Sequence, residues 1–279
     1  MNKSIAELEK IAHEIRIDIA RMFYKTQTGH FAPALSCVDI LTTLYFGGFV
    51  NPDKKFSDER DRVILSKGHA AAALYATLAK AGYFAREELL SYYDNFSRLG
   101  AHPVPVLPGV ETVSGSLGHG ICYATGVAKA AKIDDKPFKT YVILGDGESE
   151  EGSVYEAAMF ASAQNLDNLI VIMDYNKIQG SEKIEDITRL EPVVDKWAAF
   201  GWNVLRCDGN DCNALCEAMN EAYHNSNGKP SILIADTLKG KGVSFVENNV
   251  AWHSRAPKGD EWQMVCDDLQ ISLQEVAHI

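Results

Sequence analysis

Asp146 and Asn176 stand at a spacing that suits a site for a hard metal ion. Asp146 lies in the triplet GDG directly after the apolar run TYVIL, and Asn176 follows the next apolar run, LIVIM, thirty residues further on. A helical pattern from Gly152 to Asn165 fills the interval, so the segment predicts one βαβ unit with a right-handed crossover. Parallel neighbours end at the same edge of a sheet, where both side chains can reach one ion. Carboxylate, amide and backbone carbonyl oxygens suit Mg²⁺.

The residues around Asp146 are also suited to a diphosphate. Gly145 and Gly147 permit close approach of the backbone to a ligand. A helix that begins near Gly152 turns its amino end towards the same edge, which favours an anion. A GDG triplet alone is typical of an ordinary turn. The paired strand and the trailing Asn176 favour a Mg²⁺–diphosphate site instead.

The elements that must position these residues alternate along the chain. Five short apolar runs, each followed by turn residues, are apolar at both parities and predict strands covered on both faces. They are Arg62–Leu65, Thr140–Leu144, Leu169–Met173, Trp202–Arg206 and Ser231–Ala235. Helices are predicted from the capping box at Ser4 and Glu7 to about Tyr24, and over Ser36–Phe46, Ser66–Ala81, Leu117–Lys132, Gly152–Asn165, Glu191–Phe200 and Asp211–Asn225. The alternation predicts an α/β fold: a doubly wound, mostly parallel sheet with helices on both faces. Ligands of such sheets bind outside the carboxyl ends of the strands.

Composition limits the classes of partner. The chain has 279 residues with 46% hydrophobic and 23% charged residues, which is ordinary for a globular protein, and we expect one domain over residues 1–279. Its formal net charge of −11 argues against nucleic acid or an anionic membrane as the main partner. No apolar run reaches the length of a membrane span.

The cysteines and the N-terminus favour the cytoplasm. The six cysteines form no C-x-x-C pair, and Cys212 and Cys216 are four residues apart without a second pair nearby, which makes a poor zinc site. We therefore interpret all six as reduced thiols. The N-terminal residues MNKSIAELEK contain alternating charges and no apolar core, so we expect no secretory signal.

Several motifs together resemble the transketolases, which depend on thiamine diphosphate. GDGESEEG followed by MDYNKIQG is similar to the thiamine diphosphate signature of that enzyme class. TGHFAPALSCVDILTTLYF, RVILSKGHAAAALYATLAKAGYF, LGAHPVPVLPGVETVSGSLGHG and KGKGVSFVENNVAWHS resemble further transketolase motifs in the family's order. The resemblance covers residues 5 to 260. A full transketolase is far longer, so the chain resembles the N-terminal, diphosphate-binding subunit of a split, two-chain transketolase.

The resemblance implies a set of cofactor residues. Asp146 and Asn176 match side-chain ligands of Mg²⁺, for which Ca²⁺ or Mn²⁺ can substitute, and Ile178 matches a ligand through its backbone carbonyl. The residues that match contacts to thiamine diphosphate are His69, Gly115, Ser116, Leu117, Gly147, Asn176 and His253. Among them, Gly147 matches a backbone N–H donor to the diphosphate, and Gly115, Ser116 and Leu117 match the segment along the aminopyrimidine.

The resemblance also implies catalytic residues. His30 and His102 match histidines that line the substrate channel, and His253 matches one near the phosphate and the reacting carbons. Transketolases move a two-carbon ketol unit between sugar phosphates, and imidazoles that titrate near pH 7 suit the proton transfers of that reaction. Glu151 matches a buried glutamate that links the two active sites of a dimer.

Other residues near the motifs have simpler interpretations or depart from the family. Glu148 and Glu150 are interpreted as an acidic first helical turn, stabilised by the helix dipole. At position 119 the chain has His where long transketolases usually have Gln, and Phe31 stands where a smaller residue is expected. Phe31 could narrow the substrate entrance, so the sugar is left open.

The pyrimidine-binding and C-terminal domains are expected on a partner chain. The family's glutamate that activates the cofactor lies on the pyrimidine-binding domain, as do most contacts to the sugar phosphate. The resemblance therefore implies a chain that is inactive by itself and works in a heterotetramer. The alternatives are a component of another thiamine diphosphate enzyme, similar to 1-deoxyxylulose-phosphate synthase or dihydroxyacetone synthase, and a non-catalytic cofactor-binding module. A Mg²⁺-dependent nucleotide-binding protein is disfavoured because the chain lacks the motif G-x-x-x-x-G-K-[ST].

Overall fold

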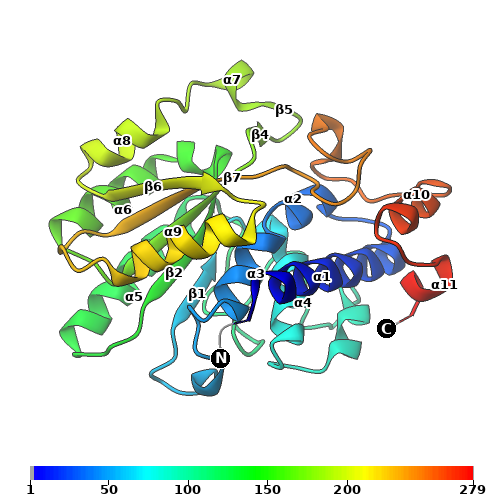
Figure 1. Ribbon diagram of the computed structural model, residues 1–279, viewed down its shortest axis with the longest axis horizontal. Coiled ribbons are helices and arrows are strands. Elements are labelled where there is room, and N and C mark those ends of the chain that lie inside the picture. Colours follow the sequence, from blue (N-terminus) through cyan, green and yellow to red (C-terminus); the bar gives the residue numbers. More distant parts are fainter. Residues whose placement is uncertain (1–2, 279) are drawn as a thin grey trace.

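A parallel sheet lies at the centre of the computed structural model, which describes residues 3–278. Within these residues the sheet has five strands in the order β1-β2-β3-β7-β6, all parallel to their neighbours (Figure 1). The strands are β1 (Arg62–Leu65), β2 (Thr140–Gly145), β3 (Leu169–Tyr175), β6 (Asn203–Asp208) and β7 (Ser231–Asp236). A short antiparallel pair, β4 (Ile178–Gln179) and β5 (Glu182–Lys183), follows β3. The predicted α/β sheet is confirmed.

Helices cover both faces of the sheet. They are α1 (Ile5–Thr26), α2 (Phe31–Ser36), α3 (Val38–Phe46), α4 (Ala71–Lys80), α5 (His119–Ile133), α6 (Gly152–Ala163), α7 (Ile184–Ile187), α8 (Val193–Ala199), α9 (Cys212–His224), α10 (Glu261–Asp268) and α11 (Leu273–Val276). Among residues 3–278, none of the helices combines the length and the apolar character needed to span a bilayer.

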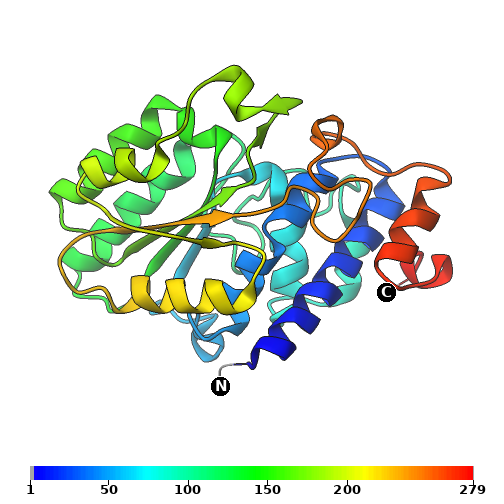
Figure 2. The same cartoon turned by 45° about the horizontal axis from the view of Figure 1, so that its top comes forward.

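Alternate residues of each strand enter two different cores, which explains why the strands are apolar at both parities. In β2, Tyr141 and Ile143 pack with residues of α1, α3, α4 and α9, whereas Val142 and Leu144 pack with residues of α5, α6 and α8. Figure 2 shows α9, in yellow, on one side of the sheet and the green helices on the other. Burial on both sides fixes the register, because a slip of one residue would exchange the two faces.

The chain reverses its direction across the sheet between β3 and β7. The chain forms β1, β2 and β3 in order from one edge of the sheet and then crosses to the other edge to form β6. It returns through α9 on the opposite face, which places β7 between β3 and β6. Such a switch point opens a crevice at the carboxyl ends of the strands. The residues after β1, β2, β3 and β7 converge there.

Helix boundaries differ from the predicted ones where the backbone turns sharply. The predicted helix Ser36–Phe46 is wrong at its start: α2 begins at Phe31, and Cys37 then departs from helical geometry before α3. Pro33 fits α2 because the first helical turn does not need its missing N–H. For the predicted helix Leu117–Lys132, the observed helix α5 begins two residues later, at His119, because Gly118 has a positive φ of 78°. The capping box of Ser4 and Glu7 is confirmed.

Candidate active site

Four histidines predicted from the motifs lie together at the carboxyl edge of the sheet. The ring centre of His30 is 5.5 Å from that of His69, 6.2 Å from that of His102 and 5.5 Å from that of His253. The rings of His69 and His253 are 5.2 Å apart. They come from four segments: the residue before α2, the turn after β1, the loop before α5 and the segment after β7. The fold thus brings together four imidazoles that the chain order separates widely.

Burial keeps these imidazoles neutral near pH 7. It lowers the pKa of His69 well below the ordinary value, with Lys67 adding to the effect, and it lowers the pKa of His253 to about 3, together with the charge on Lys239. Burial also lowers the pKa of His30 and of His102. The expectation that imidazoles of this cluster titrate near neutrality is therefore wrong for His69 and His253 in the chain by itself, because a buried cationic imidazole is penalised.

Two histidines have geometry that points to their hydrogen-bonding roles. Lys239 Nζ lies 2.9 Å from Nδ1 of His253. An ammonium can only donate, so Nδ1 must accept, and the neutral ring carries its proton on Nε2. Nδ1 of His30 is buried and, within residues 3–278, has no hydrogen-bond partner. A buried unpaired nitrogen is expected to meet a polar group of a ligand.

Asp146 and Asn176 directly follow the neighbouring strands β2 and β3, as predicted. Gly145 of β2 is paired with Asp174 of β3, so the two loops start level with each other. The carboxylate of Asp146 accepts hydrogen bonds from the backbone N–H groups of Gly147, at 2.8 Å, and Lys177. These bonds hold the carboxylate in place. The N–H of Gly147, predicted to meet the diphosphate, is directed at Asp146 here.

The site has the donor set of a hard cation. Burial and, to a lesser extent, the carboxylate of Asp174 raise the pKa of Asp146 to about 7. No ion pair to Asp146 is formed within the described part of the chain, so a cation beside it would offset the cost of its burial. In residues 3–278, no cluster of three or more His, Cys, Asp or Glu side chains is placed to bind a metal. A metal at this edge would therefore need neutral oxygens beside Asp146, and the predicted ligands Asn176 and the carbonyl of Ile178, which line the same pocket, are oxygens of the kinds that fit Mg²⁺.

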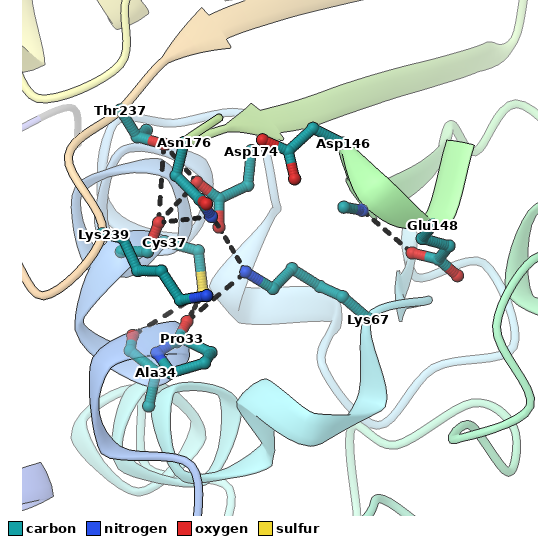
Figure 3. Close-up of polar contacts among 12 residues, drawn as sticks. Pro33, Ala34, Cys37, Lys67, Asp146, Glu148, Asp174, Asn176, Thr237 and Lys239 are labelled. Carbon is teal, nitrogen blue, oxygen red and sulfur yellow. Dashed lines mark hydrogen bonds and ion pairs between the residues drawn. The ribbon is translucent and has the colours of Figure 1, made fainter. Parts of the chain in front are cut away.

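A buried ion pair that the sequence analysis missed lies beneath this donor set. Lys67 and Asp174 form an ion pair with side-chain exposures of 2% and 0% (Figure 3). Ser36 Oγ donates to Asp174 at 2.7 Å, and the hydroxyl of Thr237 donates to the same oxygen. Burial opposes the charge of Lys67, but Asp174, together with Cys37 and Asp146, offsets this and raises the pKa of Lys67 above its ordinary value. The network also holds Asn176, whose amide donates to Ser36 Oγ at 3.2 Å.

Lys239 is a second functional candidate that the sequence analysis missed. Its side chain is buried in the pocket, where Nζ donates to the carbonyl of Ile178 at 3.1 Å and to His253. Burial lowers the pKa of Lys239 to about 8, and the charge of Lys67 contributes. A signal was present: both lysines lie in the turn segments after predicted strands, in SKGH and TLKGKG. Two buried ammonium groups suit a polyanionic ligand.

A pocket of about 400 Å³ joins these groups. It is lined by Pro33, Lys67, His69, Leu117, Gly145, Asp146, Gly147, Glu148, Glu150, Glu151, Asn176, Ile178, Gln179, Gly180, Lys239 and His253. The lining contains the three predicted metal ligands, two histidines and both lysines. A ligand with a metal-bound diphosphate and an organic part matches this combination of donors and cavity.

The segment of Gly115, Ser116 and Leu117 lies at the rim of the site. A Cβ on Gly68 would lie 2.7 Å from the backbone nitrogen of Gly115, so the glycine lets this segment pass close to the turn of His69. Gly115 has a φ of 130°, and a Cβ there would lie 3.0 Å from the ring of His102. Leu117 lines the pocket, whereas Ser116 Oγ lies 3.0 Å from Nδ1 of His119.

The three glutamates of the GDG loop differ in their surroundings. Glu151 lines the pocket and is exposed in the single chain, so its predicted burial at a dimer contact stays a prediction. Glu148 and Glu150 do lie in an acidic helical turn, but this is the separate 3₁₀ turn Gly147–Glu150 that precedes α6. Glu148 is 3% exposed and bonded to three segments of the chain.

Comparison with known proteins agrees with this geometry. Residues 8–274 match the family model described as transketolase, thiamine diphosphate binding domain. The chain is 40% identical over 273 residues to one of the subunits of apulose-4-phosphate transketolase from Phocaeicola vulgatus, covering 98% of this chain and 97% of that one. It is 39% identical over 272 residues to a 6-deoxy-6-sulfo-D-fructose transketolase subunit of a Clostridium species, covering 97% and 98%.

The solved structures add a comparison of fold. Transketolase from Campylobacter jejuni superimposes with a TM-score of 0.88 at 31% sequence identity, over 98% of this chain and 44% of the other. The chain thus spans less than half the length of that transketolase, but nearly the whole length of the two relatives that are named as transketolase subunits. It belongs to the transketolase family, of which it carries the thiamine diphosphate-binding domain.

Proposed function

We propose that this chain is the diphosphate-binding subunit of a two-chain transketolase. It holds Mg²⁺ and the diphosphate of thiamine diphosphate, and with its partner transfers a two-carbon ketol unit from a ketose phosphate to an aldose phosphate. The observation that carries the proposal is the pocket at the switch point, in which Asp146, Asn176 and the carbonyl of Ile178 lie beside buried lysines and histidines.

The cofactor supplies a carbanion and an electron sink when bound, and the chain's residues position it. Asp146, Asn176 and Ile178 are the proposed ligands of the metal. His69 and Lys239, which line the pocket, are the proposed contacts of the diphosphate, and the segment Gly115–Leu117 is proposed to hold the aminopyrimidine. The N–H of Gly147, which donates to Asp146 in the single chain, is proposed to turn to the diphosphate when the cofactor binds.

The histidines are proposed to handle protons and oxygen charge of the sugar. His253 is held by Lys239 with its Nε2 proton free to donate. His30 and His102 extend the imidazole cluster away from the diphosphate. Neutral imidazoles in a buried site can donate a hydrogen bond to a developing oxyanion and accept a proton at another step.

The partner is proposed to carry the pyrimidine-binding and C-terminal domains, so that residues 1–279 form a single domain of a heterotetramer. The support is the match to relatives named as transketolase subunits along nearly their whole length. Exposed Glu151, at the pocket's edge, is proposed to be covered by this assembly. The reduced cysteines support a cytoplasmic location as part of the proposal.

A coupled assay tests the proposal. The chain, the candidate partner and their mixture are each assayed with thiamine diphosphate and Mg²⁺, with xylulose 5-phosphate, apulose 4-phosphate and 6-deoxy-6-sulfofructose as donors. We expect turnover in the mixture only, lost with a chelator and restored by Mg²⁺, Ca²⁺ or Mn²⁺. Turnover by the chain alone would contradict the two-chain proposal. Failure of the mixture to bind thiamine diphosphate would contradict the cofactor.

A further inference from the structure

Glu148 is a buried carboxylate to which the proposed function gives no role. It follows the GDG triplet, and its side chain is buried, with its carboxylate bonded to a backbone nitrogen in Figure 3. One oxygen, Oε1, accepts from Ser66 Oγ and from the backbone N–H of Gly118 at 2.9 Å. The other, Oε2, accepts from the backbone N–H of Gly145 at 2.9 Å. A single side chain therefore joins the end of β1, the loop before α5 and the end of β2.

The three partners require an acceptor at both oxygens. Gly118 and Gly145 each present a backbone N–H, which cannot become an acceptor. A glutamine of the same shape would have to direct its NH₂ group at one of these two N–H groups, whichever way the amide is turned. The hydroxyl of Ser66 could rotate to accept, but the backbone groups could not. The site thus distinguishes Glu from Gln although the two side chains have nearly the same volume.

Gly118 is held from both sides by these contacts. Its N–H is bound by Glu148, and its carbonyl accepts from Ser153 Oγ at 3.2 Å. Its φ is 78°, and a Cβ would lie 2.4 Å from Ser153 Oγ. Gly118 follows directly on Leu117, which lines the cofactor pocket. The position of Leu117 relative to the diphosphate end of the pocket therefore depends on the carboxylate of Glu148.

The proposed metal donors are anchored by other bonds. Asp146 is held by the N–H groups of Gly147 and Lys177, and Asn176 by Ser36 Oγ. Loss of the Glu148 contacts should therefore disturb the Gly115–Gly118 segment more than the diphosphate end.

We propose that Glu148 is a positioning residue that ties the Gly115–Gly118 segment to the GDG turn, so that the organic part and the diphosphate of the cofactor are bound in register. The proposal rests on the proposed function, because it concerns how the same pocket binds thiamine diphosphate.

The test compares Glu148→Gln with Glu156→Gln, a matched change on the exposed face of α6. In the complex with the partner subunit, steady-state kinetics give kcat and the apparent KM for thiamine diphosphate. Inorganic diphosphate with Mg²⁺ is measured as a competitor of the cofactor and gives an inhibition constant for the diphosphate end alone. Hydrogen exchange on the full chain reports the amide of Gly118 directly.

We expect Glu148→Gln to raise the KM for thiamine diphosphate about tenfold, with kcat and the inhibition constant for diphosphate changed less than threefold, and to speed exchange at Gly118. Glu156→Gln should match the unmodified chain in every measurement. A KM for the cofactor within twofold of the unmodified value would overturn the proposal. An equal rise in the inhibition constant for inorganic diphosphate would also overturn the proposal, since Glu148 would then support the whole site.

Two further outcomes keep the test decisive. If the unmodified complex does not bind thiamine diphosphate, the proposed function fails, and exchange at Gly118 still decides whether Glu148 holds that segment. If Glu148→Gln does not fold, Ser66→Ala removes one of the three donors from the same carboxylate. It should raise the KM for thiamine diphosphate by a smaller factor without changing the constant for diphosphate, and an unchanged KM would count against the tether.

Discussion

The Lys67–Asp174 ion pair should contribute strongly to stability, because it is one of the most deeply buried charged pairs in the described structure. Replacing Lys67 by Met keeps most of the volume and leaves the carboxylate of Asp174 without its countercharge. Removing one partner of a buried pair costs about 3–5 kcal/mol. Asp174 keeps the hydroxyl donors Ser36 and Thr237 after this change. We therefore expect Lys67→Met to lower the free energy of unfolding by about 3 kcal/mol, at the low end of that range.

Removing the carboxylate of Asp174 should lower the free energy of unfolding more than removing the ammonium of Lys67. Asp174→Asn leaves the ammonium of Lys67 buried without a countercharge. Besides the new amide at position 174, its remaining hydrogen-bond partner is the carbonyl of Pro33 at 3.4 Å. We expect a loss of about 4 kcal/mol. The double variant removes both charges, so its cost should fall below the sum of the two single costs by about 2–3 kcal/mol.

Urea unfolding of the ligand-free chain at pH 7, followed by circular dichroism, measures these differences. The pair Lys54–Glu59, at 3.0 Å with exposures of 42% and 50%, is the control, and Lys54→Met should cost less than about 1 kcal/mol. If Lys67→Met costs as little as Lys54→Met, or if the Lys67 and Asp174 effects simply add, the reasoning is refuted. The pair would then be solvated or charge-neutral in solution.

Three other changes test separate parts of the site. Asp146→Asn should abolish Mg²⁺-dependent binding of thiamine diphosphate in calorimetry while the circular dichroism spectrum is retained; unchanged affinity would remove Asp146 from the metal site. His102→Ala should lower kcat of the complex more than it raises the KM for the cofactor, and equal losses would place His102 in the cofactor contacts. The pKa of His253 is about 3 in the folded chain, so between pH 6.5 and 3 the unfolded chain binds a proton that the folded chain does not. The free energy of unfolding is therefore highest above pH 6.5 and decreases as the pH falls towards 3. Between pH 6.5 and 4, His253→Gln should therefore reduce the slope of unfolding free energy against pH by up to about 1.4 kcal/mol per unit; an unchanged slope would show that His253 is solvated.

The strand pattern and the local motifs were enough to predict the fold and much of the site. A strand buried on both faces must be apolar at consecutive positions, so its sequence records its place inside a sheet. In a parallel sheet, the residues after each strand share one edge, which is why Asp146 and Asn176 could be placed together from their spacing alone. The four histidines were identified differently, through the resemblance of their motifs to those of transketolases.

The tertiary structure alone decided which polar groups are paired inside the site. Lys67 and Asp174 are 107 positions apart, and Glu148 binds Ser66 and Gly118 at separations of 82 and 30. No periodicity records such contacts, because they depend on how several loops pack at the switch point. The same packing moves the imidazoles to neutral forms, since a pKa depends on burial and nearby charge rather than on the residues next in sequence. The sequence therefore determined which groups reach the edge of the sheet, and the packing of the loops determined their partners and their charge.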